Sequence, residues 1–166
     1  MNGGCRAPAP TTVPLLQAAG VPVTVITSPA VPLEVVTHTV GTEVPDPLPV
    51  EGAAVSYDEV EPALGHAVGS AVVPWAKEHR DQRPQGWRLQ VDLIAGHAEY
   101  EDGRLTVTFS VRATLRARSD YSYLAQADAH CLESGRVDPR QGASVVYTCM
   151  TRLGRDLAGW LGSVDP

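Results

Sequence analysis

Between residues 105 and 116, apolar and polar side chains alternate without interruption. Successive side chains of a β-strand point to opposite faces, so this pattern predicts a strand with one buried face and one face in water. We therefore expect a half-buried strand here, and its neighbours can be placed relative to it. The apolar set is Leu105, Val107, Phe109, Val111, Ala113 and Leu115.

A second strand with the same alternation is predicted over residues 88–95, and the turn signal Glu101-Asp102-Gly103 lies between the two. Both apolar sets are odd-numbered, and residues paired directly across a hairpin must share a face. The residue numbers of two directly paired positions must then add to an even sum. This favours a three-residue loop, with Gly103 in the left-handed conformation, over a two-residue Asp-Gly loop. The predicted pairs are Tyr100 with Arg104, Leu93 with Val111, Asp92 with Arg112, and Leu89 with Leu115.

A third strand is predicted over residues 121–131, and its small side chains suggest that a helix packs closely over it. The three strands together form an antiparallel meander with one face covered. The side chains expected on the covered side of the third strand are Tyr123, Ala125, Ala127, Ala129 and Cys131.

Two amphipathic helices are predicted as the cover. The first begins near residues 56–58, where both Ser56…Glu59 and Asp58…Glu61 have capping-box spacing, and Pro74 is expected to kink or end it. In the second, apolar residues recur at spacings of three and four: Val146, Cys149, Met150, Leu153, Leu157, Trp160 and Leu161.

The N-terminal quarter is dominated by proline: nine of the fourteen prolines come before residue 50. Such a segment disfavours helix and central strand. We expect residues 1–20 to be a tether and residues 21–166 to form a single domain, in which 21–27 and 33–40 are short edge strands and 44–50 an extended loop. The predicted fold class is α+β, an antiparallel β-meander of about three strands, plus short N-terminal strands, packed against two helices.

Cys5 is a candidate for lipidation. Gly3, Gly4 and Cys5 match the last three positions of a bacterial lipoprotein signal, and a Pro/Thr-rich stretch follows them. Asn2 stands where that signal has an aliphatic residue, so the hypothesis requires a hydrophobic signal segment upstream of residue 1. The alternative is an ordinary cytoplasmic protein with an exposed terminal thiol.

The other two cysteines are predicted to form a disulfide. Cys131 shares its strand face with the alanines that point toward the covering helix, and Cys149 lies on the apolar stripe of the last helix. The intervening seventeen residues are enough for a strand to turn into a helix. The alternative is a pair of buried free thiols. A disulfide would place the protein outside the reducing cytosol.

The sequence shows no catalytic, cofactor-binding or metal-binding motif. His97 and Glu99 lie on one strand face and could ligate a metal, but two ligands without a third make a polar rim the better interpretation. His66 is interpreted as a partly buried boundary residue, and His38, His79 and His130 as surface positions. We therefore predict that the protein is not an enzyme and needs no cofactor.

Charge disfavours nucleic acid as a partner, because thirteen basic and nineteen acidic residues give a net charge of −6. The one basic cluster is Arg112, Arg116 and Arg118. It could dock an acidic partner or lipid headgroups, but a solvated sheet face with Asp92 as counter-charge is the preferred interpretation. No apolar run is long enough to span a membrane, so membrane attachment is expected only through a lipid anchor.

A Cys-initiated tether, then a helix, an antiparallel meander and a closing amphipathic helix together resemble small outer-membrane lipoproteins of bacteria. The nearest comparisons are LPS-assembly lipoproteins of the LptE type and auxiliary lipoproteins of ABC-type lipid transporters. The resemblance covers Cys5 and residues 56–162 and rests on the order of these elements.

The resemblance implies a non-enzymatic envelope lipoprotein, an accessory subunit of an outer-membrane assembly or lipid-transport complex with a protein partner. Its location would be periplasmic, anchored to the outer membrane if Cys5 is lipidated, and otherwise cytoplasmic. The alternative is a small soluble binding module that holds a lipid or another apolar ligand between helix and sheet.

Overall fold

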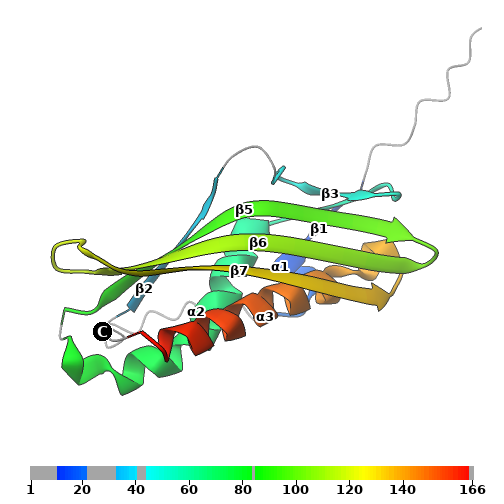
Figure 1. The fold of residues 1–166 in the computed structure, drawn as a ribbon. Helices are drawn as coiled ribbons and strands as arrows, with labels where there is room; N and C mark the ends of the chain where they lie inside the picture. The colour runs from blue at the N-terminus through cyan, green and yellow to red at the C-terminus, as the bar shows by residue number, and fades with distance from the viewer. Residues whose placement is uncertain (1–10, 22–32, 41–43, 84, 165–166) are drawn as a thin grey trace, which may run out of the picture.

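A computed structural model describes residues 11–21, 33–40, 44–83 and 85–164. Within these ranges the chain forms a seven-stranded sheet and two long helices, together with one short helix near the start and two 3-10 turns. Both long helices, α2 (Val60–Glu78) and α3 (Ala143–Leu161), lie on the same face of the sheet (Figure 1). The predicted α+β class is confirmed, but the sheet is larger than a three-stranded meander and mixed in direction.

The meander consists of β5 (Trp87–Glu101), β6 (Arg104–Ala117) and β7 (Tyr123–Arg136), paired antiparallel in that order. Their inward side chains form the middle of the core, and Leu89, Leu93 and Leu115 have no exposed surface. β7 is the last strand of the sheet, so one of its edges has no strand partner among the described residues.

The predicted register holds over half of the first hairpin. Leu93 pairs with Val111 and Leu89 with Leu115, and Gly103 has the expected positive φ of 76°. The loop itself is different: Glu101 pairs with Arg104, and the register shifts between Leu93 and Ala95. One extra residue is needed to keep the apolar side chains of both strands on the same face. It lies in a bulge in the middle of β5 and not in the loop. Asp102 also adopts a positive φ of 52°, as a two-residue turn of the mirror-image type requires.

The short strands join the meander on the β5 side. β2 (Leu33–Thr39) runs parallel to the first half of β5, and β3 (Leu48–Glu51) runs parallel to its second half. β4 (Val55–Asp58) pairs with β3 and with β1 (Thr11–Pro14), which extends the sheet outward. The expected strand at 33–40 is thus confirmed, the extended loop at 44–50 ends in a strand, and most of the predicted strand at 21–27 lies outside the described residues.

The expected tether boundary at residue 20 is too late. β1 and the short helix α1 (Leu15–Ala18) belong to the domain, and Leu15 is fully buried in its core. Proline at position 14 permits this because an outer strand can end on a residue that donates no hydrogen bond. Residues 1–10 lie outside the described residues.

The start of α2 also differs from expectation. Neither capping box forms, because residues 55–58 are taken up by β4, where the Ser56 side chain is buried. The helix begins at Val60 after Glu59, whose φ of 61° turns the chain sharply out of the strand. It also continues through Pro74, since Trp75 and Ala76 beyond it are buried against the sheet. Burial of these side chains offsets the hydrogen bond that proline removes.

Candidate functional site

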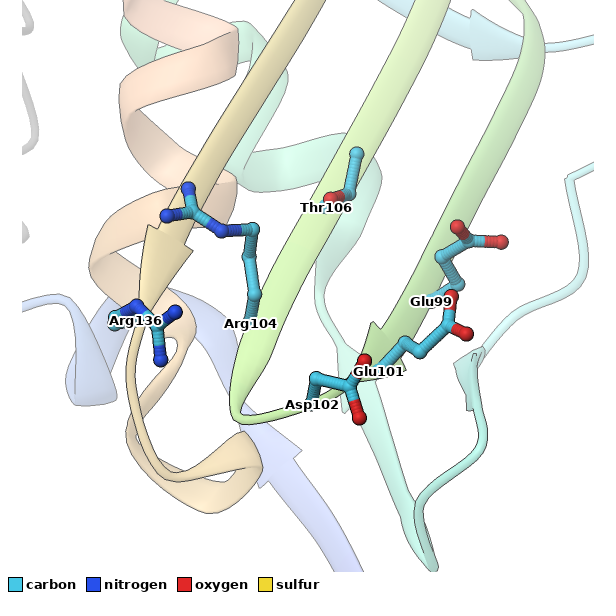
Figure 2. Close-up of a pocket in the computed structure, with 6 residues that line it drawn as sticks. All are labelled: Glu99, Glu101, Asp102, Arg104, Thr106 and Arg136. Atoms are coloured by element: carbon cyan, nitrogen blue, oxygen red, sulfur yellow. The ribbon is translucent and has the colours of Figure 1, made fainter.

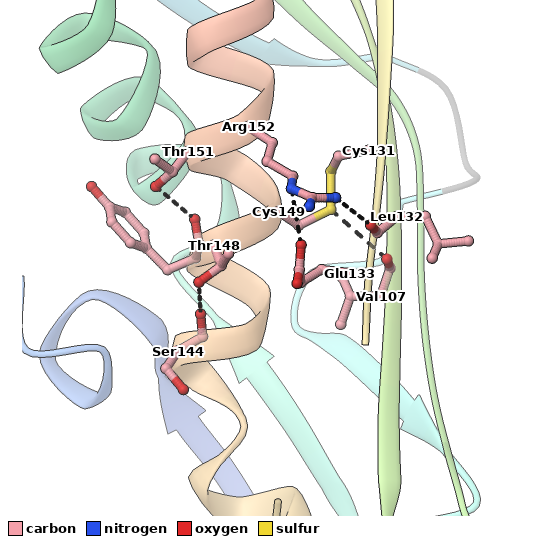
Figure 3. The surroundings of a disulfide bond; sticks show 10 residues. Val107, Cys131, Leu132, Glu133, Ser144, Thr148, Cys149, Thr151 and Arg152 are labelled. Atoms are coloured by element: carbon pink, nitrogen blue, oxygen red, sulfur yellow. Dashed lines mark hydrogen bonds and ion pairs between the residues drawn. A yellow bond between two sulfur atoms is a disulfide. The ribbon is translucent and has the colours of Figure 1, made fainter. Parts of the chain in front are cut away.

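The Cys131–Cys149 disulfide is the site-level prediction that the structure confirms. Cys131 lies on the covered face of β7 opposite Phe109, and Cys149 lies on the buried stripe of α3. Their Cα atoms are 5.5 Å apart, within the range that a disulfide requires. The bond joins the edge strand of the sheet to the helix that covers it (Figure 3).

Arg152 ties the same two elements together one turn further along α3. Its Nε lies 3.2 Å from Oε2 of Glu133, and its Nη1 donates to the backbone carbonyl of Leu132 at 3.2 Å. Figure 3 shows this side chain reaching across to β7 beside the disulfide. Because Arg152 is more than half exposed, the ion pair contributes little to stability. The hydrogen bond from Arg152 has a local effect, since it gives the Leu132 carbonyl a donor on the edge of β7 that has no strand partner in the described part of the chain.

The layer between α3 and the sheet is filled by side chains. Val146, Met150 and Leu153 have no exposed surface, and a Cβ on Gly135 of β7 would lie only 3.0 Å from a methyl carbon of Val145. Contacts this close leave no room for a guest molecule at these positions. Where the described residues form it, this layer does not favour the expected apolar-ligand site between helix and sheet.

The outer face of the meander carries a solvated ion pair. Asp92, Arg112 and Asp128 lie side by side on β5, β6 and β7, as the predicted pairing of Asp92 with Arg112 requires. The guanidinium binds Asp128, with Nε 2.9 Å from Oδ1, so the preferred counter-charge is on β7 and not on β5. That hydrogen bond lowers the pKa of Asp128 and raises the pKa of Arg112.

The other two arginines of the basic cluster also have partners. Arg116 donates to the backbone carbonyl of Tyr121 at 3.0 Å, and Arg118 lies 3.8 Å from the carboxylate of Glu34. Each arginine therefore has an acceptor within the chain, which supports the interpretation of a solvated sheet face over a docking site for anions.

Histidine side chains fall into three settings. His66 is partly buried, as expected, and its Nδ1 lies 2.8 Å from the Tyr147 hydroxyl, which links α2 to α3. His79 was expected on the surface, but it caps the end of α2, and its ring stacks on that of Trp75 with 4.8 Å between the ring centroids. His38 and His130 are exposed, as expected.

His97 has a more acidic surrounding than the sequence indicated. Its Nε2 lies 3.5 Å from the Glu99 carboxylate, and the structure adds Glu51 of β3 at 3.2 Å. Glu51 could not be found from spacing, because its neighbour in space is 46 residues away and depends on the parallel pairing of β3 with β5. The two glutamates occupy directly paired positions in that ladder.

A shallow hollow of about 270 Å³ lies beside this cluster at the end of the hairpin. Figure 2 shows its acidic side chains over β5 and the turn and its arginines over β6 and β7. The arrangement separates the two signs of charge. The lining residues are Glu99, Glu101, Asp102, Arg104, Thr106 and Arg136.

Cys5, the predicted lipidation site, lies outside the described residues, as do Asn2, Gly3 and Gly4. None of the helices in the described ranges has the length and apolar character needed to cross a membrane.

Comparison with known proteins identifies the fold and leaves the activity open. No family model matches the chain, and no curated protein matches its sequence. A Xanthomonas campestris protein of the family DUF330 has a similar structure, with a TM-score of 0.53 and 16% identity over 79% of this chain and 84% of that one. At this identity the likeness shows a shared fold alone.

Two further solved structures are more distant. A candidate lipoprotein from Caulobacter crescentus has a TM-score of 0.48 and 15% identity, over 82% of this chain and 95% of its own. A hypothetical protein from Chlamydia trachomatis has a TM-score of 0.47 and 11% identity, over 78% and 95%. The α+β arrangement expected from the element order is shared with the Xanthomonas campestris protein, while resemblance to the LptE type in particular stays a prediction.

Proposed function

We propose that the protein is a non-enzymatic lipoprotein of the bacterial cell envelope, an accessory subunit of an outer-membrane assembly or lipid-transport complex. The observation that carries the proposal is the disulfide between Cys131 and Cys149. Structural disulfides form and persist in oxidising compartments and are rare in the cytosol. Cys5, at the end of a lipoprotein-like box, supplies the point of attachment.

The accessory role is supported by the form of the sheet. Helices cover one face, and the opposite face of β5, β6 and β7 is open among the described residues (Figure 1). Its exposed side chains are mixed in charge, with Arg112 on the middle strand β6 and Asp128 and His130 on the edge strand β7. Interfaces between non-obligate partners are about as polar as ordinary surface, so this composition suits a protein partner.

Lipidation is tested by metabolic labelling. The gene is expressed with its own upstream sequence in a Gram-negative host that is fed radiolabelled palmitate. We expect label on the wild-type protein, which fractionates with the outer membrane, and no label on Cys5→Ala. An unlabelled wild-type protein in the cytosol with Cys131 and Cys149 reduced would remove the proposal.

The partner is tested separately by photo-crosslinking in the native host. A photoreactive amino acid is placed at His130 on the open sheet face and, as a control, at Ser70, which is exposed on α2. We expect an adduct with an envelope protein from position 130 and none from position 70. The absence of adducts at position 130, with the protein correctly located, would contradict the accessory role while leaving lipidation intact.

A further inference from the structure

We propose that Glu51, His97 and Glu99 form a binding site for a divalent transition metal, Zn²⁺ in the first place. The three side chains lie on the outer face of the sheet where β3 joins β5. Each offers one ligand atom, and the three atoms lie within 4.8 Å of one another. One imidazole nitrogen and two carboxylate oxygens are a donor set that zinc accepts in proteins.

Two of the three donor separations are close to those of a tetrahedral coordination shell. Zinc binds histidine nitrogen and carboxylate oxygen at about 2.0–2.2 Å, which places adjacent ligand atoms roughly 3.3–3.6 Å apart. The Nε2 atom of His97 lies 3.2 Å from Oε2 of Glu51 and 3.5 Å from Oε2 of Glu99. The third separation, between the two carboxylate oxygens, is at most 4.8 Å, so binding a metal requires the two exposed glutamate side chains to close around it.

Backbone pairing holds the ligands in this arrangement. Glu51 and Glu99 are direct partners in the parallel ladder, and His97 precedes Glu99 by two residues on the same strand face. Their side chains must then project from one side of the sheet as close neighbours. This fixed origin distinguishes the cluster from carboxylates gathered by chance on a flexible loop.

The charge of the cluster favours a cation. Among the described residues, the only ion-pair partner of either carboxylate is His97. Thr106 and Thr108 face Glu99 and His97 from β6 and bring no positive charge. The two carboxylates bring two negative charges, which a divalent ion would neutralise.

Nitrogen donation favours zinc over calcium or magnesium, which take oxygen ligands. The side chains are from one half to nearly three-quarters exposed, so a fourth position faces water. The site is therefore open, and we expect the bound metal to exchange with the solution.

Metal binding would also secure a weak point of the sheet. β3 is joined to β5 through only two residue pairs, Val50 with Ala98 and Glu51 with Glu99. A metal held by residues of both strands would clip them together. A ligand that binds only the folded state raises its stability in proportion to occupancy, so zinc should raise the melting temperature.

The test is a zinc titration of the untagged full chain by isothermal calorimetry, in a Cys5→Ser background because a free thiolate binds zinc by itself. We expect one zinc per chain and a rise in melting temperature. In H97A the affinity should fall at least about tenfold, and the melting temperature should no longer respond to zinc. E51Q and E99Q should each weaken binding.

The matched controls are E101Q and H130A. Glu101 lies two residues beyond Glu99 on β5 but does not belong to the group of three clustered ligand atoms, and His130 is exposed on β7. Both variants should bind zinc like the Cys5→Ser parent. The visible absorption of bound Co²⁺ should show tetrahedral coordination in the parent and be lost in H97A. The proposal is overturned if the parent binds no zinc, or if H97A binds it as tightly as the parent does.

Discussion

Single residues in this protein link segments that are far apart in the chain. Tyr57 of β4 donates a hydrogen bond to the backbone carbonyl of Pro139, in the turn before α3. Its side chain is fully buried. Gly142 closes the same corner, because a Cβ there would lie closer than any real contact to the Tyr57 hydroxyl and to a methyl carbon of Leu105. Close packing at these few positions fixes where the last helix begins.

The first residue-scale prediction concerns the disulfide. Replacing both Cys131 and Cys149 by alanine should lower the free energy of unfolding by about 3 kcal/mol, because the bond restricts the unfolded chain. For a chain of this size the melting temperature should fall by roughly 6–12 °C. Thiol titration of the unfolded, unreduced chain, produced without lipidation, should detect one free thiol, that of Cys5. Detection of three free thiols would show that the bond does not form.

The second concerns Tyr57. Burial raises the pKa of its hydroxyl to about 12, whereas an unfolded tyrosine titrates near pH 10. The hydroxyl therefore stays protonated to a higher pH in the folded state than in the unfolded state. The resulting stabilisation is complete below about pH 10 and is lost as the pH rises through about 12. Urea unfolding between about pH 9 and pH 12 should show this loss in the wild type and less of it in Tyr57→Phe.

At neutral pH, Tyr57→Phe should cost about 1 kcal/mol for the lost hydrogen bond. Equal alkaline losses in the two proteins would place the responsible ionisation elsewhere.

At the scale of elements, α3 contains two glycines with opposite roles. A Cβ on Gly154 would lie 2.8 Å from the backbone carbonyl oxygen of Ala67, so this glycine lets α2 and α3 approach closely. A Cβ on Gly159 would meet nothing within 4 Å. Gly154→Ala should therefore destabilise the protein by about 1–3 kcal/mol, and Gly159→Ala should stabilise it by up to about 1 kcal/mol. Chemical denaturation of both variants measures this difference. Equal changes in the free energy of unfolding for the two variants would show that helix propensity alone determines the effect of each substitution.

The N-terminal elements give another comparison of neighbours. Leu15 of α1 is fully buried, whereas Leu16 beside it is only partly buried. Leu15→Ala should cost about 3 kcal/mol, because it leaves a cavity in the core, and Leu16→Ala should cost clearly less. Thermal or urea unfolding tests this. If Leu15→Ala leaves the stability unchanged, the segment does not belong to the domain in solution.

The contrast between correct and incorrect element predictions follows from the range of the interactions. The strands β5, β6 and β7 and the helix α3 carry strong periodic patterns, so their existence and most of their faces could be predicted locally. β5 and β7 nevertheless extend beyond the predicted 88–95 and 121–131, and Tyr123 is exposed because a register shift separates it from the rest of β7. β4 could not be predicted locally, because Ser56 and Asp58 resemble helix caps and only the pairing of this segment with β1 and β3 makes it a strand. The even sum of paired residue numbers correctly predicted one extra residue in the first hairpin, but its predicted place in the loop was wrong. It lies near Ile94, because the face pattern fixes the number of extra residues and not their position.

At the scale of the whole molecule, the candidate sites divide in the same way. Cys131 and Cys149 could be paired from the sequence because each lies on a clearly patterned face, and the faces had to meet. Glu51 could not be joined to His97 and Glu99, because that contact depends on a parallel ladder only two residue pairs long. The buried Leu15 was hidden for a similar reason: proline-rich composition suggested a tether although the segment pairs with a strand far along the chain.

The disulfide between β7 and α3 also has a mechanical consequence. If the chain is pulled from its two ends, the residues between Cys131 and Cys149 cannot extend, because the bond carries the load past them. At up to about 3.6 Å per residue, a loop with a sequence separation of 18 withholds roughly 60 Å of contour length. An envelope protein held at one end and loaded at the other would yield that length only after reduction. Its reach under tension is thus set by the redox state of a single bond.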